Sequence, residues 1–193
     1  MNNKNIQLIT RTAMLLAITL LFQQLRLLIG ATMVSTIIIG SLVNLALFVS
    51  AATVGWRGSI FVAVLSPVVA ALQGHLPHPL LIPFVAAGNL TLVLVYELAA
   101  GKQGNAVKQW FAVAAASLAK TAVLYVAVVL VFVPLILPGL NAPEKLLKAM
   151  QAALPVSFSW PQLVTAAIGG IVSIPVISGI RRAFQKENGA GAR

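Results

Sequence analysis

The sequence predicts an all-α membrane protein with six transmembrane helices and both termini in the cytoplasm. Hydrophobic residues make up 60% of the chain and charged residues 8%, with a mean hydropathy of +0.99. Soluble domains carry roughly a quarter charged residues. Apolar runs of membrane-spanning length recur along the chain, and most basic residues lie at the ends of these runs. Residues 1–193 therefore form a single integral membrane domain in this interpretation.

The six predicted spans follow the apolar runs, because a helix needs about 20 apolar residues to cross a bilayer. They cover residues 9–29, 36–55, 59–73, 80–100, 107–133 and 161–180, approximately. The third is short and contains Pro67. A proline there predicts a kinked or broken helix whose freed carbonyl must be satisfied inside the protein. Spans of this number leave no room for a soluble domain, so any energy source would lie on another chain.

The first span has features of a retained helix with a docking face. A secretory signal is the alternative, but Gln23, Gln24 and Arg26 follow the apolar part without an Ala-x-Ala cleavage site. Ala13 and Ala17 are four residues apart, so they share one helix face. Small residues on one face allow a second helix to approach closely. We therefore expect Ala13 and Ala17 to form a surface for a partner helix.

The distribution of basic residues predicts the orientation of the spans. With a cytoplasmic N-terminus, nine basic residues flank the inner ends of the spans. Only Arg26, Lys145 and Lys148 then lie outside. Since inner connections carry the excess of Lys and Arg, this orientation is favoured. It places residues 30–35, 74–79 and 134–160 on the outer side.

The last of these outer connections predicts a short surface helix. Asn141, Pro143 and Glu144 are typical of a helix cap and first turn, and apolar residues follow at helical spacing through about residue 154. We expect a helix over about 143–154 that forms a lid or rim; a helix that only packs is the alternative. The terminal residues 187–193 are predicted to be flexible.

Polar side chains of the predicted spans fall at one depth. Counting 1.5 Å per residue in a hydrocarbon core of about 30 Å puts Lys120 about 10 Å below the outer face. Asn44 and Asn89 come out at the same level by the same count. The remaining members are level with this layer or nearer the outer face: Gln23, Gln73, Gln162 and Thr165. The sequence thus predicts a polar layer in the outer half of the protein.

Lys120 carries the strongest functional signal in this layer. A lysine at that depth costs at least ~2.5 kcal/mol unless it faces a partner or water. It could instead snorkel or bond to helix carbonyls. Glu97, the one acid within a span, lies more than about 10 Å from Lys120 in depth by the same count. We therefore expect Lys120 to be unpaired by protein and available to an anionic group of a ligand.

The other candidate ligand contacts each have a structural alternative. Asn89 follows a glycine and could equally bond another helix. Arg26 could anchor to outer lipid phosphates. Tyr125 and Trp160 could stack on a ligand ring, but such residues are also common at membrane interfaces.

Catalytic and metal chemistry find little support. His75 and His78 are three residues apart, but no acid or cysteine lies nearby to complete a metal site. The chain has no nucleophile, metalloprotease or phosphate-binding motif and only 3 acidic residues. The sequence therefore predicts neither an enzyme nor an ion-coupled transporter, and we expect no cofactor and no nucleic-acid partner.

The Ala-x-x-x-Ala step at Ala13 and Ala17, the six spans, the inner termini and the outer polar layer resemble the S components of energy-coupling factor (ECF) vitamin transporters. The resemblance covers nearly the whole chain. It implies an S-component-like helical bundle in the cell membrane of a prokaryote. It also implies a water-soluble vitamin or precursor held beneath the outer loops, and no catalysis on this chain.

Further expectations follow from the same resemblance. Ala13 and Ala17 would dock on a membrane T component, and two ATPases below it would drive uptake. Family members that bind nickel or cobalt use a histidine near the N-terminus, where this chain begins MNNKN; a metal substrate is therefore disfavoured. The lysine indicates a carboxylate- or phosphate-bearing ligand, for which folate or pantothenate are examples. Two other classes stay open: a structural protein of a cell-shape or assembly complex, and a stand-alone transporter or channel for small solutes.

Overall fold

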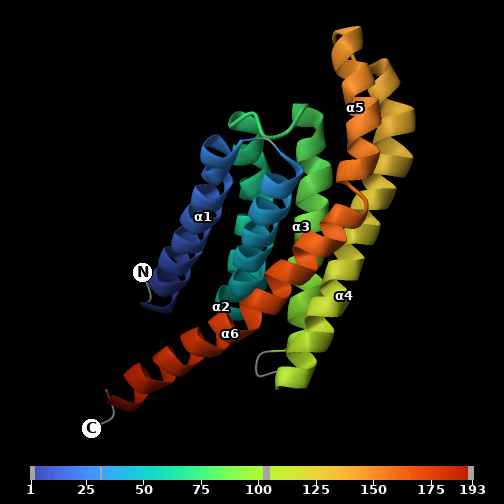
Figure 1. Cartoon of the computed structure of the whole chain (residues 1–193). Helices are drawn as coiled ribbons and strands as arrows, with labels where there is room; N and C mark the ends of the chain where they lie inside the picture. Colours follow the sequence, from blue (N-terminus) through green and yellow to red (C-terminus); the bar gives the residue numbers. More distant parts are fainter. Residues whose placement is uncertain (1–2, 31, 102–104, 191–193) are drawn as a thin grey trace.

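The computed structural model describes residues 3–30, 32–101 and 105–190, and these residues form helices and short connections without a strand. The elements in chain order are α1 (Asn3–Ile29), α2 (Met33–Leu72), η1 (Pro79–Leu81), α3 (Ile82–Ala100), α4 (Ala106–Leu124), η2 (Tyr125–Ile136), η3 (Leu137–Gly139), α5 (Glu144–Ser157) and α6 (Trp160–Ala190). Figure 1 shows α1, α2 and α3 side by side, with α6 crossing them obliquely. The all-helical membrane fold expected from the sequence is confirmed.

Five of the described helices are long and apolar enough to cross a membrane, where the sequence analysis expected six spans. The difference lies in α2, a 40-residue helix interrupted at Gly55, where φ is 69° and ψ is −178°. A straight helix would separate Thr36 from Ala70 by about 50 Å. Both residues nevertheless line one cavity, so the chain folds back at Gly55. Residues 33–54 (the first arm) and 56–72 (the second arm) correspond to the second and third expected spans; the number of membrane crossings stays a prediction.

The first arm and α6 lie in close contact through glycine. A Cβ atom on Gly169 would collide with the Ser41 carbonyl oxygen and would meet the Leu45 nitrogen at 2.7 Å. On Gly88 of α3 a Cβ would meet the Leu124 side chain at 2.6 Å. Because only glycine leaves room at such approaches, these contacts fix how closely the first arm lies to α6 and α3 to α4.

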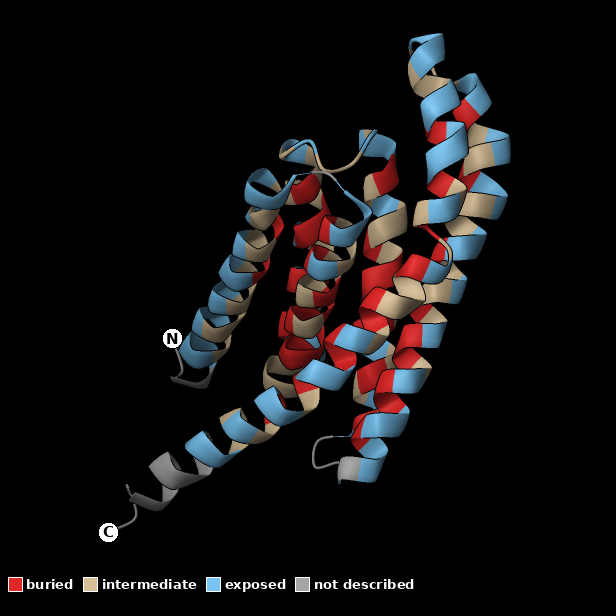
Figure 2. Ribbon diagram, in the orientation of Figure 1, coloured by how far each residue is buried: buried red, intermediate tan, exposed pale blue. Residues whose placement is uncertain are grey.

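Buried residues gather between the helices, and exposed residues cover the outward faces (Figure 2). The larger hydrophobic cluster joins both arms of α2 to α3, α4 and α6. Its largest side chains, Phe48 and Tyr96, meet edge to face with ring centroids 5.1 Å apart. A second cluster joins η2 to α5 and to the start of α3. The bundle therefore has a packed middle beneath the polar residues described below.

The predicted surface helix occurs as α5, but not as a cover over the bundle. It packs along η2, and the two rise together above the other helices (Figure 1). Residues 187–190, predicted to be flexible, belong to α6; the remaining residues of that prediction, 191–193, lie outside the described part of the chain.

Candidate functional site

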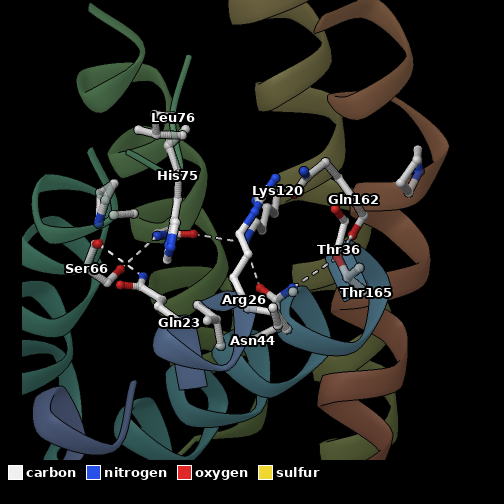
Figure 3. A pocket seen from close by; sticks show the side chains of 18 residues that line it. Gln23, Arg26, Thr36, Asn44, Ser66, His75, Leu76, Lys120, Gln162 and Thr165 are labelled. Atoms are coloured by element: carbon white, nitrogen blue, oxygen red, sulfur yellow. Dashed lines mark hydrogen bonds between the residues drawn. The ribbon is translucent and has the colours of Figure 1, made fainter. Parts of the chain in front are cut away.

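A cavity of about 180 Å³ lies where the ends of six helical segments meet. Its lining includes seven of the candidates selected from the sequence: Gln23, Arg26, Asn44, Asn89, Lys120, Gln162 and Thr165. They come from α1, the first arm of α2, α3, α4 and α6, and Figure 3 shows the labelled ones directed toward a common space. Residues that were predicted to lie at a similar depth in different spans thus line one cavity.

Lys120 lies at the centre of a hydrogen-bond network at the floor of this cavity. Its ammonium donates to the Asn44 Oδ1 atom at 2.6 Å and to the Asn89 Oδ1 atom at 2.8 Å. All three side chains are 4% exposed or less. The expectation that Lys120 has no protein partner is therefore wrong, because two amide oxygens solvate it. An ammonium has three N–H donors, so one remains beyond these two bonds.

The two amides are held in turn by neighbouring elements. Asn44 donates from its Nδ2 atom to the Thr165 hydroxyl at 3.2 Å. Asn89 donates from Nδ2 to the Ala63 carbonyl and the Ser66 hydroxyl, both at 3.3 Å. Because the nitrogen of each amide donates to a neighbouring element, the amide is held in one orientation, with its oxygen facing Lys120.

Pro67 explains why Asn89 has this partner. A proline at this position has no N–H to give the Ala63 carbonyl, four residues earlier. The sequence predicted that this carbonyl must be satisfied within the protein, and the Asn89 amide donates to it. Gln23 reaches the same segment, donating to the Ser66 carbonyl at 3.1 Å. Ser66 itself was not selected from the sequence, although its position next to Pro67 was the available signal.

The cavity carries positive charge without an acidic partner. Arg26 and Lys120 line it, and no Asp or Glu is among its described lining residues. Glu144 forms an exposed ion pair with Lys148 at 2.7 Å, and Glu97 lines a different cavity. The arrangement is suited to an anion, because the charge of Lys120 is solvated by amides rather than neutralised.

His75 is a further lining residue that the sequence analysis treated only as a possible metal ligand. Its Nε2 atom is buried without a partner. Burial, and then the nearby charge of Arg26, lower the pKa of His75 below 6.5. His78 instead caps η1, where its Nδ1 accepts from the Leu80 N–H at 3.2 Å. No group of three metal-ligating side chains occurs among the described residues.

Tyr125 and Trp160 do not belong to this cavity. They are 42% and 54% exposed and neither lines it. They were proposed from their residue type, which does not determine which way a side chain points around its helix. Their role as stacking partners of a ligand ring stays a prediction that this cavity does not support.

A second polar cavity, of about 310 Å³, lies beside Gly55, where the two arms of α2 meet. Tyr96, Glu97 and Arg181 line it. The Tyr96 hydroxyl and the Glu97 Oε2 atom are buried and have no hydrogen-bond partner. We call this the inner cavity and the Lys120 site the outer cavity, after the orientation predicted from the sequence.

The predicted docking face lies on the outside of the bundle. Ala13 and Ala17 are exposed on α1. Ala13 also lines an apolar groove of about 660 Å³ between α1 and the second arm, whose wall includes Trp56, Phe61 and Leu65. Gly58 lies in the same groove, where an added Cβ would meet the Thr12 hydroxyl at 2.5 Å.

Comparison with known proteins gives one finding that covers most of the chain. The family model described as ECF transporter, substrate-specific component, matches residues 7–181. No curated protein and no solved structure matches the chain.

Proposed function

This chain belongs to the family of substrate-specific components of ECF transporters, and we propose that it binds its solute in the outer cavity. Family membership makes it a multi-pass membrane protein that binds substrate rather than an enzyme. The solute would be a water-soluble vitamin or precursor taken from outside a prokaryotic cell. The single observation that carries the proposal is the network of Lys120, Asn44 and Asn89 at the floor of that cavity.

The network supports binding because the fold itself provides hydrogen-bond acceptors for the buried Lys120 ammonium. A buried ammonium needs hydrogen-bond acceptors, and the two amides supply them without cancelling its charge. An arriving anion therefore meets a cation that is already desolvated and held in place. Sites organised before binding lose less entropy when the ligand is captured.

The charge of the outer cavity supports a ligand with a carboxylate or a phosphate. Arg26 and Lys120 contribute cations, and Gln162 and Thr165 add hydrogen-bonding groups on the α6 side. Folate and pantothenate are the examples that the sequence analysis named, and both carry carboxylates.

Uptake would need partner chains, since this chain has no nucleotide-binding motif. We propose that a membrane T component docks on the exposed face of α1 at Ala13 and Ala17, and that two ATPases drive the cycle. The groove beside Ala13 supports this, because small residues and an apolar wall allow close approach of a helix without strong polar bonds.

The test is native mass spectrometry of the purified protein released gently from detergent. Wild type is compared with Lys120→Met, which removes the charge, and with Lys148→Met, a control on the exposed surface of α5. We expect a retained small molecule in wild type and Lys148→Met, and its loss from Lys120→Met. Circular dichroism would establish that all three proteins are folded.

Three results would contradict the proposal. Folded wild type that retains nothing, and binds nothing after incubation with a vitamin panel, would favour the structural membrane protein. Saturable uptake into liposomes by this chain alone would favour the stand-alone transporter. Equal ligand retention by Lys120→Met would leave a binding subunit but remove the outer cavity as its site.

A further inference from the structure

Among the residues that the structure describes, no Phe, Trp or Tyr lines the outer cavity. The chain has 8 Phe, 3 Trp and 2 Tyr, yet the apolar part of the wall is aliphatic, contributed by Ile39, Val43, Leu76 and Val85 with prolines. The nearest aromatic candidates from the sequence, Tyr125 and Trp160, lie outside it. Sites for ring-shaped ligands normally use aromatic side chains that stack on the ring.

The outer cavity is also small. Its volume of about 180 Å³ is below the roughly 300–1,000 Å³ that pockets for drug-sized ligands have. The floor cannot widen by simple side-chain rotation, because the Lys120, Asn44 and Thr165 side chains bond one another. The wall is tight as well: a Cβ on Gly40 would meet Thr165 at 2.9 Å. A broad, flat ring system does not fit this floor.

Two polar atoms at the cavity have no hydrogen-bond partner in the protein and could bond hydroxyl or amide groups of a ligand. The Gln23 Oε1 atom and the His75 Nε2 atom are buried without partners, although both residues line the cavity. A carboxamide oxygen accepts hydrogen bonds, and a ring nitrogen donates or accepts according to its tautomer. A ligand O–H or N–H would satisfy the Gln23 oxygen, which otherwise carries the cost of burial.

We infer that the solute is a compact, non-aromatic acid bearing hydroxyl or amide groups, with its anionic group at Lys120 and Arg26 and its polar groups at Gln23 and His75. This inference rests on the proposed function. It separates the two examples given above: pantothenate has this chemistry, whereas folate carries aromatic rings and is too large for the observed cavity.

The test compares two sets of acids for binding to the purified protein by isothermal titration calorimetry in detergent. The non-aromatic set contains pantothenate, pantoate and other hydroxy acids; the aromatic set contains folate, nicotinate and 4-aminobenzoate. We expect saturable binding from the non-aromatic set alone. Each hydroxy acid is also compared with its analogue lacking the hydroxyl, in wild type and in Gln23→Met.

In wild type the hydroxyl should strengthen binding by about twofold to tenfold, the effect of one hydrogen bond, and in Gln23→Met this advantage should disappear. An unchanged hydroxyl advantage would remove Gln23 as the contact. Binding of an aromatic acid as tight as that of any non-aromatic one would overturn the inference and leave the proposed function standing. A cation or a neutral compound retained in native mass spectrometry would also overturn the inference and leave the proposed function standing. Failure of every acid, together with no retained molecule in native mass spectrometry, would overturn both.

Discussion

The outer and inner cavities are both polar, but their ionisable side chains Lys120 and Glu97 are satisfied in different ways. In the outer cavity Lys120 has two amide partners, and those amides have partners of their own. In the inner cavity the Tyr96 hydroxyl and the Glu97 Oε2 atom are buried with no partner, and no ion pair joins Glu97 to Arg181. A polar group that the fold satisfies contributes to stability, whereas one that the fold leaves unpaired costs stability. Lys120 and its amide partners therefore contribute to the stability of the fold, whereas the Tyr96 hydroxyl and the Glu97 Oε2 atom do not.

The largest expected effect comes from the glycine contact that holds the outer cavity together. Gly169→Leu would force a side chain against the Ser41 carbonyl and the Leu45 nitrogen, both backbone atoms that cannot rotate away. We expect a loss of at least about 3 kcal/mol in stability and of ligand binding. Gly179→Leu is the matched control on the same helix, since nothing lies within 4 Å of its added Cβ. Thermal unfolding in detergent measures both, and equal melting temperatures would contradict the packing argument.

Removal of one polar group from each cavity tests the comparison directly. Lys120→Met leaves the Asn44 and Asn89 oxygens without their donor, which costs about 1–3 kcal/mol for each unsatisfied group. Relief from desolvation of the charge offsets part of this cost. Tyr96→Phe removes a hydroxyl that has no partner, so we expect no loss of stability or a small gain. A greater destabilisation by Tyr96→Phe than by Lys120→Met, measured by the same unfolding assay, would reverse the comparison.

Glu97→Gln should have a smaller effect of the same kind. The variant keeps the shape and removes a charge whose Oε2 atom is buried and unpaired. We expect a change in stability within about 1 kcal/mol and an unaltered affinity for ligand. A clear loss of stability would mean that the carboxylate has a partner, such as Arg181, in the protein in solution.

The smallest expected effect is the pH dependence due to His75. Its lowered pKa means that the folded protein holds this proton less tightly than the unfolded chain, whose histidine titrates near 6.5. The contribution of His75 to stability is therefore complete above pH 6.5 and declines as pH falls through that value. An anionic ligand between His75, Arg26 and Lys120 would raise this pKa, so its affinity should increase toward acid, by at most about tenfold per pH unit. In His75→Gln both trends should vanish; titrations from pH 8 to 5.5 that match wild type would exclude His75 as their source.

The sequence predicted the depth of the polar residues better than the direction in which they point. Lys120, Asn44 and Asn89 were placed at one level by counting residues along their spans, and they bond one another in the structure. Tyr125 was expected to face a ligand, but it is 42% exposed and does not line the cavity. Rise along a helix follows from residue number, whereas rotation around the axis depends on which helices are neighbours, and a single sequence does not contain that information.

The connections were harder to predict than the spans. The turn at Gly55 was expected between two spans, but its left-handed φ and its place beside Glu97 depend on the packing of α3. The helix at Glu144–Ser157 was predicted from its apolar spacing, but the expected cap was wrong: Pro143, not Asn141, is the N-cap residue, and no side chain caps the helix. Its position along η2 was not predicted, because an amphipathic face shows that a partner surface exists without saying which one.

Six helical segments each supply only a few residues to the outer cavity, while Gly88 and Gly169, whose close contacts space the helices, do not line it. Selectivity and architecture are consequently encoded at separate positions. During evolution such proteins can therefore change single residues of the cavity wall, and with them the solute that is bound, without altering the helix packing. Substitutions at Ile39, Val43 or Val85 should accompany changes of substrate, and substitutions at Gly169 should be rare.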